Sequence, residues 1–121
     1  MVLVAVDDFL FRSKIRTTGK QAGVELVFAQ SGQELLDQAR ALKPALVVFD
    51  LNSGKLEPIA TITAMKQDPA LAGIRTLGFV SHVDVDAIAA ARHAGTDQVM
   101  ARSAFAAQLA EILLAGGTGP D

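Results

Sequence analysis

The stretch VLVAVDDF, residues 2–9, opens the chain with an apolar run that stops at two adjacent aspartates, Asp7 and Asp8. Similar short apolar runs recur along the chain, at residues 24–29, 45–49, 76–80 and 98–101. Several of them are apolar almost throughout, which is typical of parallel strands that helices cover on both faces. The opening run therefore predicts a buried strand of a parallel sheet, with carboxylates at its carboxyl end.

Segments with a helical period separate these runs. Ser31 and Glu34 have the spacing of a capping box at the start of one helix. The predicted helices are residues 9–20 (with Leu10, Phe11, Ile15 and Thr18 on the apolar face), 31–42, 59–65, 85–94 and a fifth that Ser103 caps, with Phe105, Leu109, Ile112 and Leu113 buried. Five strands alternating with five helices predict an α/β domain with a three-layer open sheet.

The composition fits one globular domain of 121 residues, with 50% hydrophobic and 20% charged residues. We place this domain at residues 1–115, and we expect the tail GGTGPD, 116–121, to be disordered. The net charge of -2 and the scattered basic residues argue against direct binding of nucleic acid. The absence of cysteine excludes a thiolate metal site and is compatible with the cytoplasm. The first apolar run is too short for a membrane span or a signal peptide.

Polar side chains that can bind ions or take part in reactions follow the predicted strands. They are Asp7 and Asp8 after the first strand, Asp50 and Asn52 after the third, Ser81 after the fourth and Arg102 after the fifth. In an open parallel sheet, the functional crevice lies beyond the carboxyl ends of the strands. We therefore expect these side chains to converge at one edge of the sheet.

Three carboxylates in one crevice repel one another unless a cation is present. Mg²⁺ prefers oxygen ligands and is often held by one or two carboxylates together with water. Asp8 and Asp50 are the expected direct ligands, the backbone carbonyl of Asn52 is a third, and Asp7 is expected to act through water. Two alternatives stay open: the aspartates cap the first helix, or Arg102 acts as a fixed counter-ion that makes Mg²⁺ unnecessary.

The set of motifs resembles the receiver domain of two-component response regulators, as in the chemotaxis regulators. The resemblance covers residues 2–114 and rests on VDDF at 6–9, FDLN at 49–52, FVSH at 79–82 and AARHAGTDQVMARS at 90–103. It implies a flavodoxin-like, doubly wound three-layer sandwich with a five-stranded parallel sheet in the order 2-1-3-4-5. It also implies a phosphorelay module rather than an enzyme with a separate substrate.

By this resemblance, Asp50 accepts the phosphoryl group, while Asp7 and Asp8 hold Mg²⁺ together with Asp50 and the Asn52 carbonyl. Ser81 corresponds to the switch hydroxyl that follows the phosphoryl oxygen, and Arg102 stands where receivers carry a lysine. Self-phosphorylation and self-dephosphorylation at the aspartate are then the only chemistry. The implied partners are a sensor histidine kinase or phosphotransfer protein and a downstream protein in the cytoplasm, and a homodimer is compatible with the pattern.

Several positions depart from the receiver pattern. Arg102 is followed by Ser103 instead of proline, Val99 occupies the aromatic switch position, and His82 replaces a small residue. These departures favour an alternative, in which the chain is a degenerate pseudo-receiver that binds proteins independently of phosphorylation. A flavodoxin-like cofactor binder is disfavoured, because the loop after the first strand has no Gly, Ser or Thr cradle for a phosphate.

Overall fold

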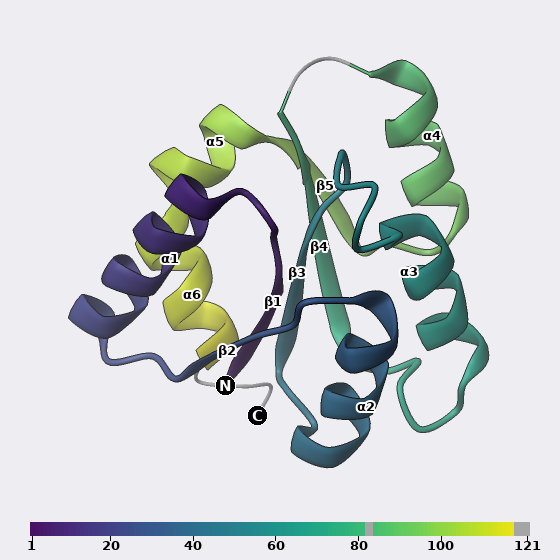
Figure 1. Ribbon diagram of the computed structural model, residues 1–121, viewed down its shortest axis with the longest axis horizontal. Helices are drawn as coiled ribbons and strands as arrows, with labels where there is room; N and C mark the ends of the chain where they lie inside the picture. The colour runs from purple at the N-terminus through teal and green to yellow at the C-terminus, as the bar shows by residue number, and fades with distance from the viewer. Residues whose placement is uncertain (82–83, 118–121) are drawn as a thin grey trace.

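The computed structural model describes residues 1–81 and 84–117. Strands and helices alternate along the chain as far as residue 107, and a further helix follows directly (Figure 1). The strands are β1 (Val2–Ala5), β2 (Leu26–Phe28), β3 (Leu46–Asp50), β4 (Arg75–Val80) and β5 (Gln98–Ala101). The helices are α1 (Phe9–Ala22), α2 (Gly32–Leu42), α3 (Pro58–Gln67), α4 (Val85–His93), α5 (Arg102–Ala107) and α6 (Leu109–Gly117).

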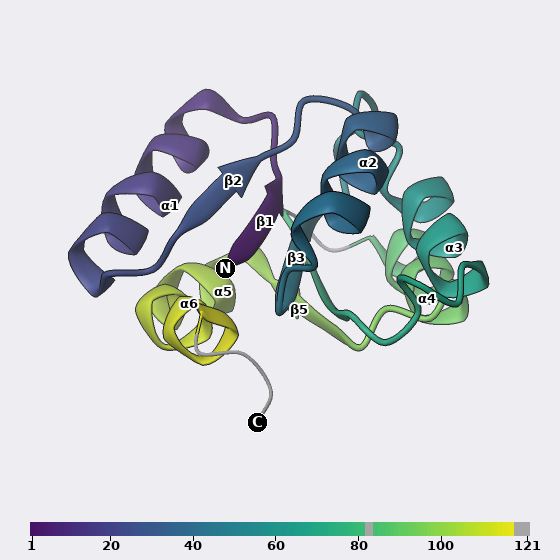
Figure 2. The same cartoon turned by 90° about the horizontal axis from the view of Figure 1, so that it is seen from below.

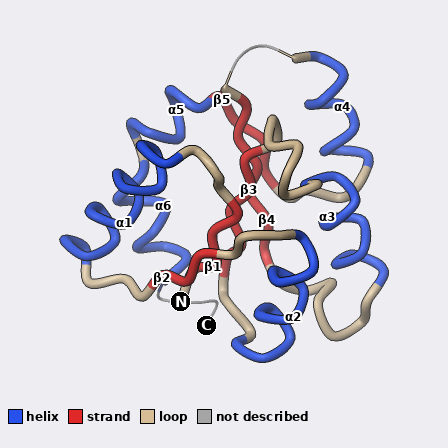
Figure 3. Tube along the Cα trace, in the orientation of Figure 1, coloured by secondary structure: helices blue, strands red, loops and turns tan. Residues whose placement is uncertain are grey.

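The five strands form one parallel sheet in the order β2-β1-β3-β4-β5, as predicted. The sheet lies between two layers of helices. Helices α1, α5 and α6 cover one face, and α2, α3 and α4 cover the other, as the view from below shows (Figure 2). The order in which strands are added to the sheet reverses between β1 and β3, because β2 lies on one side of β1 and β3 lies on the other. The loops that follow β1 and β3 leave the same edge of the sheet (Figure 3).

Two apolar cores flank this sheet, and the strands contribute alternate residues to each. From β1, Leu3 and Ala5 face the α2–α4 layer, whereas Val2 and Val4 pack with α1, α5 and α6. All four are buried, which explains why the opening stretch is apolar without alternation. The buried rings of Phe11, Phe79 and Phe105 form a cluster within the second core.

The helix starts confirm the predicted cap at Ser31 and correct the predicted cap at Ser103. The Ser31 hydroxyl caps α2 by accepting a hydrogen bond from the Glu34 N–H at 3.1 Å, and Pro58 occupies the first turn of α3. The predicted cap at Ser103 is wrong, because α5 already begins at Arg102 and its N-cap is Ala101, which makes no side-chain hydrogen bond. Leu10, which we expected on the apolar face of α1, is 78% exposed.

The last predicted helix is two helices. The chain leaves helical geometry at Gln108, with φ of -107° and ψ of 12°, so the described residues contain six helices instead of five. Phe105, Leu109 and Leu113 are buried on both sides of this break, as the pattern predicted. Helix α6 continues to Gly117, so the first two residues of the stretch 116–121 are helical. Residues 118–121 of the predicted tail lie outside the described residues, as does His82.

Candidate functional site

Asp50 lies at the carboxyl end of β3, in the middle of the sheet. Its side chain is only 7% exposed, although it is a carboxylate. The backbone N–H of Asn52 donates a hydrogen bond of 2.9 Å to Asp50 Oδ1. Oδ2 accepts no hydrogen bond from residues 1–81 or 84–117. The turn after β3 therefore fixes Oδ1, whereas Oδ2 has no hydrogen-bond donor among the described residues and can contact a ligand.

The environment of Asp50 raises its pKa above the ordinary value of 3.8. Burial is the main cause, because it disfavours the charged form, and the negative charges of Asp7 and Asp8 act in the same direction. The hydrogen bond from Asn52 and the positive charge of Arg102 lower the pKa without cancelling this effect. A positive charge placed beside these carboxylates would stabilise the ionised form of Asp50.

Asp7 follows β1 and is exposed at the same edge of the sheet. The Ser53 hydroxyl donates a hydrogen bond of 2.8 Å to Asp7 Oδ2. The same buried hydroxyl accepts from the Leu56 N–H at 3.2 Å. Ser53 therefore joins the loop between β3 and α3 to the loop after β1, which fixes the Asp7 carboxylate beside that of Asp50.

Asp8 caps α1 and forms an ion pair with Arg102. Its Oδ1 accepts a hydrogen bond from the Phe11 N–H at 3.0 Å and so caps α1. Its Oδ2 lies 3.3 Å from Nη2 of Arg102, in a partly exposed ion pair. The helix-capping alternative is therefore correct for Asp8, whose two oxygens both have protein partners.

Arg102 begins α5 and reaches back across the edge of the sheet to Asp8. Its guanidinium also lies over the Phe11 ring, 4.3 Å from the ring centroid. The sequence placed Arg102 in this acidic pocket, and the structure confirms that position, but its ion pair is with Asp8 and not with Asp50. Its effect on Asp50 is the longer-range attraction that lowers the pKa of that carboxyl.

Ser81 follows β4 and is exposed. Its backbone N–H donates a hydrogen bond of 2.6 Å to Oδ1 of Asn52. The sequence assigned Asn52 only a backbone carbonyl ligand, so this side-chain link is new. It joins the loop that carries Asp50 to the start of the loop after β4.

The sequence therefore identified the residues that converge here but missed how they are held. Ser53 was not singled out, because Ser is common in turns and its partner, Asp7, is 46 positions away in the sequence. The only local signal was the polar loop LNSG, residues 51–54, directly after a buried strand.

The oxygen donors at this edge match the ligand preference of Mg²⁺. No group of three or more Asp, Glu or His side chains within residues 1–81 and 84–117 is arranged to hold a metal ion by itself. A site made of two carboxylates, the Asn52 carbonyl and water would need fewer acidic side chains. Because Arg102 already pairs with Asp8, direct coordination by that carboxylate would compete with this ion pair.

Within residues 1–81 and 84–117, no helix is long and apolar enough to cross a membrane.

Comparison with family models and with curated proteins gives no match. Solved structures, in contrast, are similar over nearly the whole chain. A response regulator from Hahella chejuensis is 20% identical, with a TM-score of 0.81 over 93% of this chain and 90% of the other. The chemotaxis protein CheY4 of Vibrio cholerae is 17% identical, with a TM-score of 0.80 over 95% and 96%. The phosphorylated cyanobacterial phytochrome response regulator RcpA is 23% identical, with a TM-score of 0.77 over 94% and 88%.

These similarities agree with the order of the strands in the sheet. At this level of identity, the likeness concerns the fold. The chain has the flavodoxin-like fold of response regulator receiver domains.

Proposed function

We propose that this chain is a receiver module of two-component signalling that accepts a phosphoryl group on Asp50. The observation that carries the proposal is the buried Asp50 carboxylate, which lies between two other aspartates and one arginine at the carboxyl edge of a receiver fold. One solved structure with this fold is of a phosphorylated response regulator.

In the proposed reaction, Oδ2 of Asp50 attacks the phosphorus of a phosphohistidine in a partner protein. The new O–P bond forms as the N–P bond breaks, and the released imidazole takes up a proton from water. The product is an acyl phosphate on Asp50. The hydrogen bond from Asn52 to Oδ1 orients the carboxylate, so that Oδ2 faces the phosphodonor.

A cation would offset the negative charges of the acidic pocket during this step. Mg²⁺, held by Asp50, the Asn52 carbonyl and the aspartates after β1, would supply the positive charge that phosphoryl transfer requires. Ser53 keeps Asp7 in place through its 2.8 Å hydrogen bond. Arg102 contributes a second, fixed positive charge from α5, in the role that the sequence assigned to it in place of lysine.

Ser81 is proposed to read the modified state. Its hydroxyl would bind an oxygen of the phosphoryl group, and this contact would move the loop after β4. The hydrogen bond between the Ser81 N–H and Asn52 links that movement to the loop that carries Asp50. The output would then pass to a downstream protein by docking. A sensor histidine kinase or phosphotransfer protein, a cytoplasmic location and pairing of two copies belong to the same proposal.

The test is incubation with acetyl phosphate and MgCl₂, followed by intact-mass analysis. We expect the native chain to gain the mass of one phosphoryl group, and Asp50→Asn to gain none. Ser53→Ala should be phosphorylated more slowly, because Asp7 loses its anchor. If the native chain gains no phosphoryl mass at any donor or Mg²⁺ concentration, or if Asp50→Asn gains as much as the native chain, the phosphoacceptor proposal is wrong.

A second candidate function is a pseudo-receiver that docks proteins without phosphorylation. The ion pair between Arg102 and Asp8 favours it, because a fixed guanidinium already neutralises one of the three carboxylates. In that case, neither the native chain nor Arg102→Lys would take up phosphate, and Mg²⁺ would give no saturable change in NMR spectra. Restored phosphorylation in Arg102→Lys alone would instead show that the arginine has closed a competent site.

A further inference from the structure

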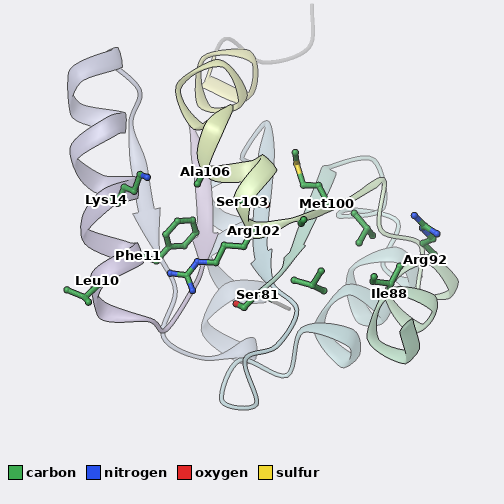
Figure 4. Close-up of a pocket in the computed structure, with 13 residues that line it drawn as sticks. Leu10, Phe11, Lys14, Ser81, Ile88, Arg92, Met100, Arg102, Ser103 and Ala106 are labelled. Atoms are coloured by element: carbon green, nitrogen blue, oxygen red, sulfur yellow. The ribbon is translucent and has the colours of Figure 1, made fainter. Parts of the chain in front are cut away.

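A pocket with a volume of about 750 Å³ opens beside the candidate site, between α1, α4, α5 and the carboxyl ends of β4 and β5 (Figure 4). We name it the β5 pocket. Six of its lining residues define it: Leu10, Lys14, Arg92, Val99, Arg102 and Ala106. A volume of roughly 300–1,000 Å³ is usual for sites that bind small molecules.

The inner surface of the β5 pocket is largely apolar. Val80, Val99 and Met100 line it from the two neighbouring strands, and Ile88 lines it from α4. The side chains of Val99 on β5 and Ala106 on α5 are short, and they line the space without filling it. An apolar body of the size of one or two aromatic rings would therefore displace water from these surfaces when it binds.

The charges on the pocket are all of one sign. Lys14, Arg92 and Arg102 line it, and no Asp or Glu is among its lining residues in the described part of the chain. Arg102 is engaged by Asp8 and by the Phe11 ring. Lys14 and Arg92 form no ion pair with residues 1–81 or 84–117. These two cations lie on opposite sides of the pocket, one on α1 and the other on α4 (Figure 4).

We propose that the β5 pocket binds a small organic anion, with an apolar body and a carboxylate, sulfonate or phosphate group. The apolar body packs between β5, α4 and α5. The anionic group pairs with Lys14 or Arg92, which have no other charged partner in the described structure. An acidic peptide is a different class of occupant, and it lacks the compact apolar body that the apolar lining of the pocket favours.

The probe for the test is 1-naphthalenesulfonate, with 1-naphthalenemethanol as the uncharged match. The chain contains neither Trp nor Tyr, so the fluorescence of the naphthalene probes can be followed without a background from these residues. Measurements need no phosphodonor and no Mg²⁺, so failure of the phosphoacceptor proposal does not affect them. We expect saturable binding of the sulfonate, roughly tenfold tighter than that of the alcohol, because charge-assisted contacts add to burial.

Charge variants locate the anionic group. Lys14→Gln and Arg92→Gln should weaken binding of the sulfonate, together by about tenfold, and leave binding of the alcohol unchanged. Arg75→Gln is the matched control, since Arg75 is an exposed cation at the opposite end of β4. Higher salt should weaken only the charged probe. Val99→Phe should abolish binding of both probes by filling the space, with its fold checked by circular dichroism.

Three results would overturn the proposal. They are equal affinity for the sulfonate and the alcohol, equal loss of binding in Arg75→Gln and in the pocket variants, and binding of both probes that never saturates. A fourth is an Asp/Glu-rich peptide that binds with Lys14-dependent affinity while neither naphthalene saturates, since this would assign the surface to a protein partner.

Discussion

At the scale of single residues, Ser53 and Arg102 do more to shape the acidic pocket than their positions in the sequence indicate. Ser53 joins two loops through one buried hydroxyl, which donates to Asp7 and accepts from Leu56. Arg102 joins the first residue of α5 to the N-cap of α1 through its ion pair with Asp8. Both contacts connect segments that are far apart in the chain.

We predict that Ser53→Ala destabilises the fold. The substitution leaves the Leu56 N–H in a buried place without its acceptor, which costs about 1–3 kcal/mol. Urea unfolding followed by circular dichroism measures the loss. Ser13→Ala is the control, because Ser13 is exposed on α1, and it should leave the midpoint nearly unchanged. Equal midpoints for native protein and Ser53→Ala would contradict the anchoring role.

We predict that Arg102→Gln raises the pKa of Asp50 further. The positive charge of Arg102 lowers that pKa in the native protein, so its removal disfavours the ionised carboxylate. NMR titration of ¹³C-labelled aspartate carboxyls in EDTA follows the change directly. Lys55→Gln removes a cation from the loop after β3 that is not among the causes of the Asp50 shift, and it should leave the titration unchanged. A lower Asp50 pKa in Arg102→Gln would show that the charge of Arg102 does not stabilise the ionised Asp50 carboxylate.

At the scale of elements, the α5–α6 pair shows how a buried stripe continues through a helix break. Gln108 leaves helical geometry, yet its N–H still donates to the carbonyls of Ala104 and Phe105. Phe105 and Leu109, which flank the break, stay buried. The break leaves the apolar spacing intact, and Gln is a good helix former, so nothing in the local sequence marks it.

A substitution at Gly116 tests whether the end of α6 packs against the sheet. A Cβ at this position would lie 2.8 Å from Leu46 Cδ2 and 3.1 Å from Val2 Cγ2. Overpacking of this kind costs about 1–3 kcal/mol, which exceeds the gain of about 1 kcal/mol in helix propensity. We therefore expect Gly116→Ala to lower the free energy of unfolding in a urea titration. Gly73→Ala, where no neighbour lies within 4 Å, should have little effect. A stabilised Gly116→Ala would mean that α6 frays before this residue.

At the scale of the whole molecule, the free energy of unfolding depends on pH through Asp50 and Asp97, whose pKa values are shifted in opposite directions. Burial raises the pKa of Asp50 above 3.8. For Asp97, burial also raises the pKa, but hydrogen bonds from Thr76 and Lys66 together lower it below 3.8. Because a shifted pKa changes the free energy of unfolding with pH, each group leaves its own signature.

We predict that Asp50→Asn stabilises the protein at neutral pH. With a raised pKa, the ionised Asp50 destabilises the folded state above its folded pKa, and this cost disappears as the pH falls below 3.8. Asparagine has no charge to desolvate, and its Oδ1 can still accept from the Asn52 N–H. Urea midpoints in EDTA should therefore be higher for Asp50→Asn at pH 7 and converge with the native values near pH 3. Lower stability of the variant at pH 7 would contradict this.

We predict the opposite for Asp97. Its lowered pKa stabilises the fold above pH 3.8, and this contribution is lost as the pH falls through the folded pKa. The contacts are those of Oδ2 with the Thr76 N–H at 2.8 Å, the Thr76 hydroxyl at 3.0 Å and Lys66 Nζ at 3.2 Å. Asp97→Asn should lower stability at pH 7 and flatten its decline in acid. Glu25→Gln, at an exposed carboxylate, is the control and should keep the native slope.

The sequence by itself determined the order of strands and helices and most of the core. Apolar runs such as residues 2–6 and 46–49 are buried, as their composition and spacing predict for strands covered on both faces. Local signals also worked where both partners lie within one turn, as for Ser31 and the Glu34 N–H. Asp7, Asp8, Asp50, Ser81 and Arg102 were predicted to converge because parallel strands end at one edge.

Only the tertiary structure decided how these groups are partnered. Asp8, and not Asp50, is the partner of Arg102, and the Ser53 hydroxyl reaches Asp7. The pairs lie 94 and 46 positions apart in the sequence. Such contacts depend on the distances between loop ends and on the side-chain conformations that packing allows, and no local pattern of residues encodes them. The same reason explains why the β5 pocket appears only when α1, α4 and α5 are placed around β5.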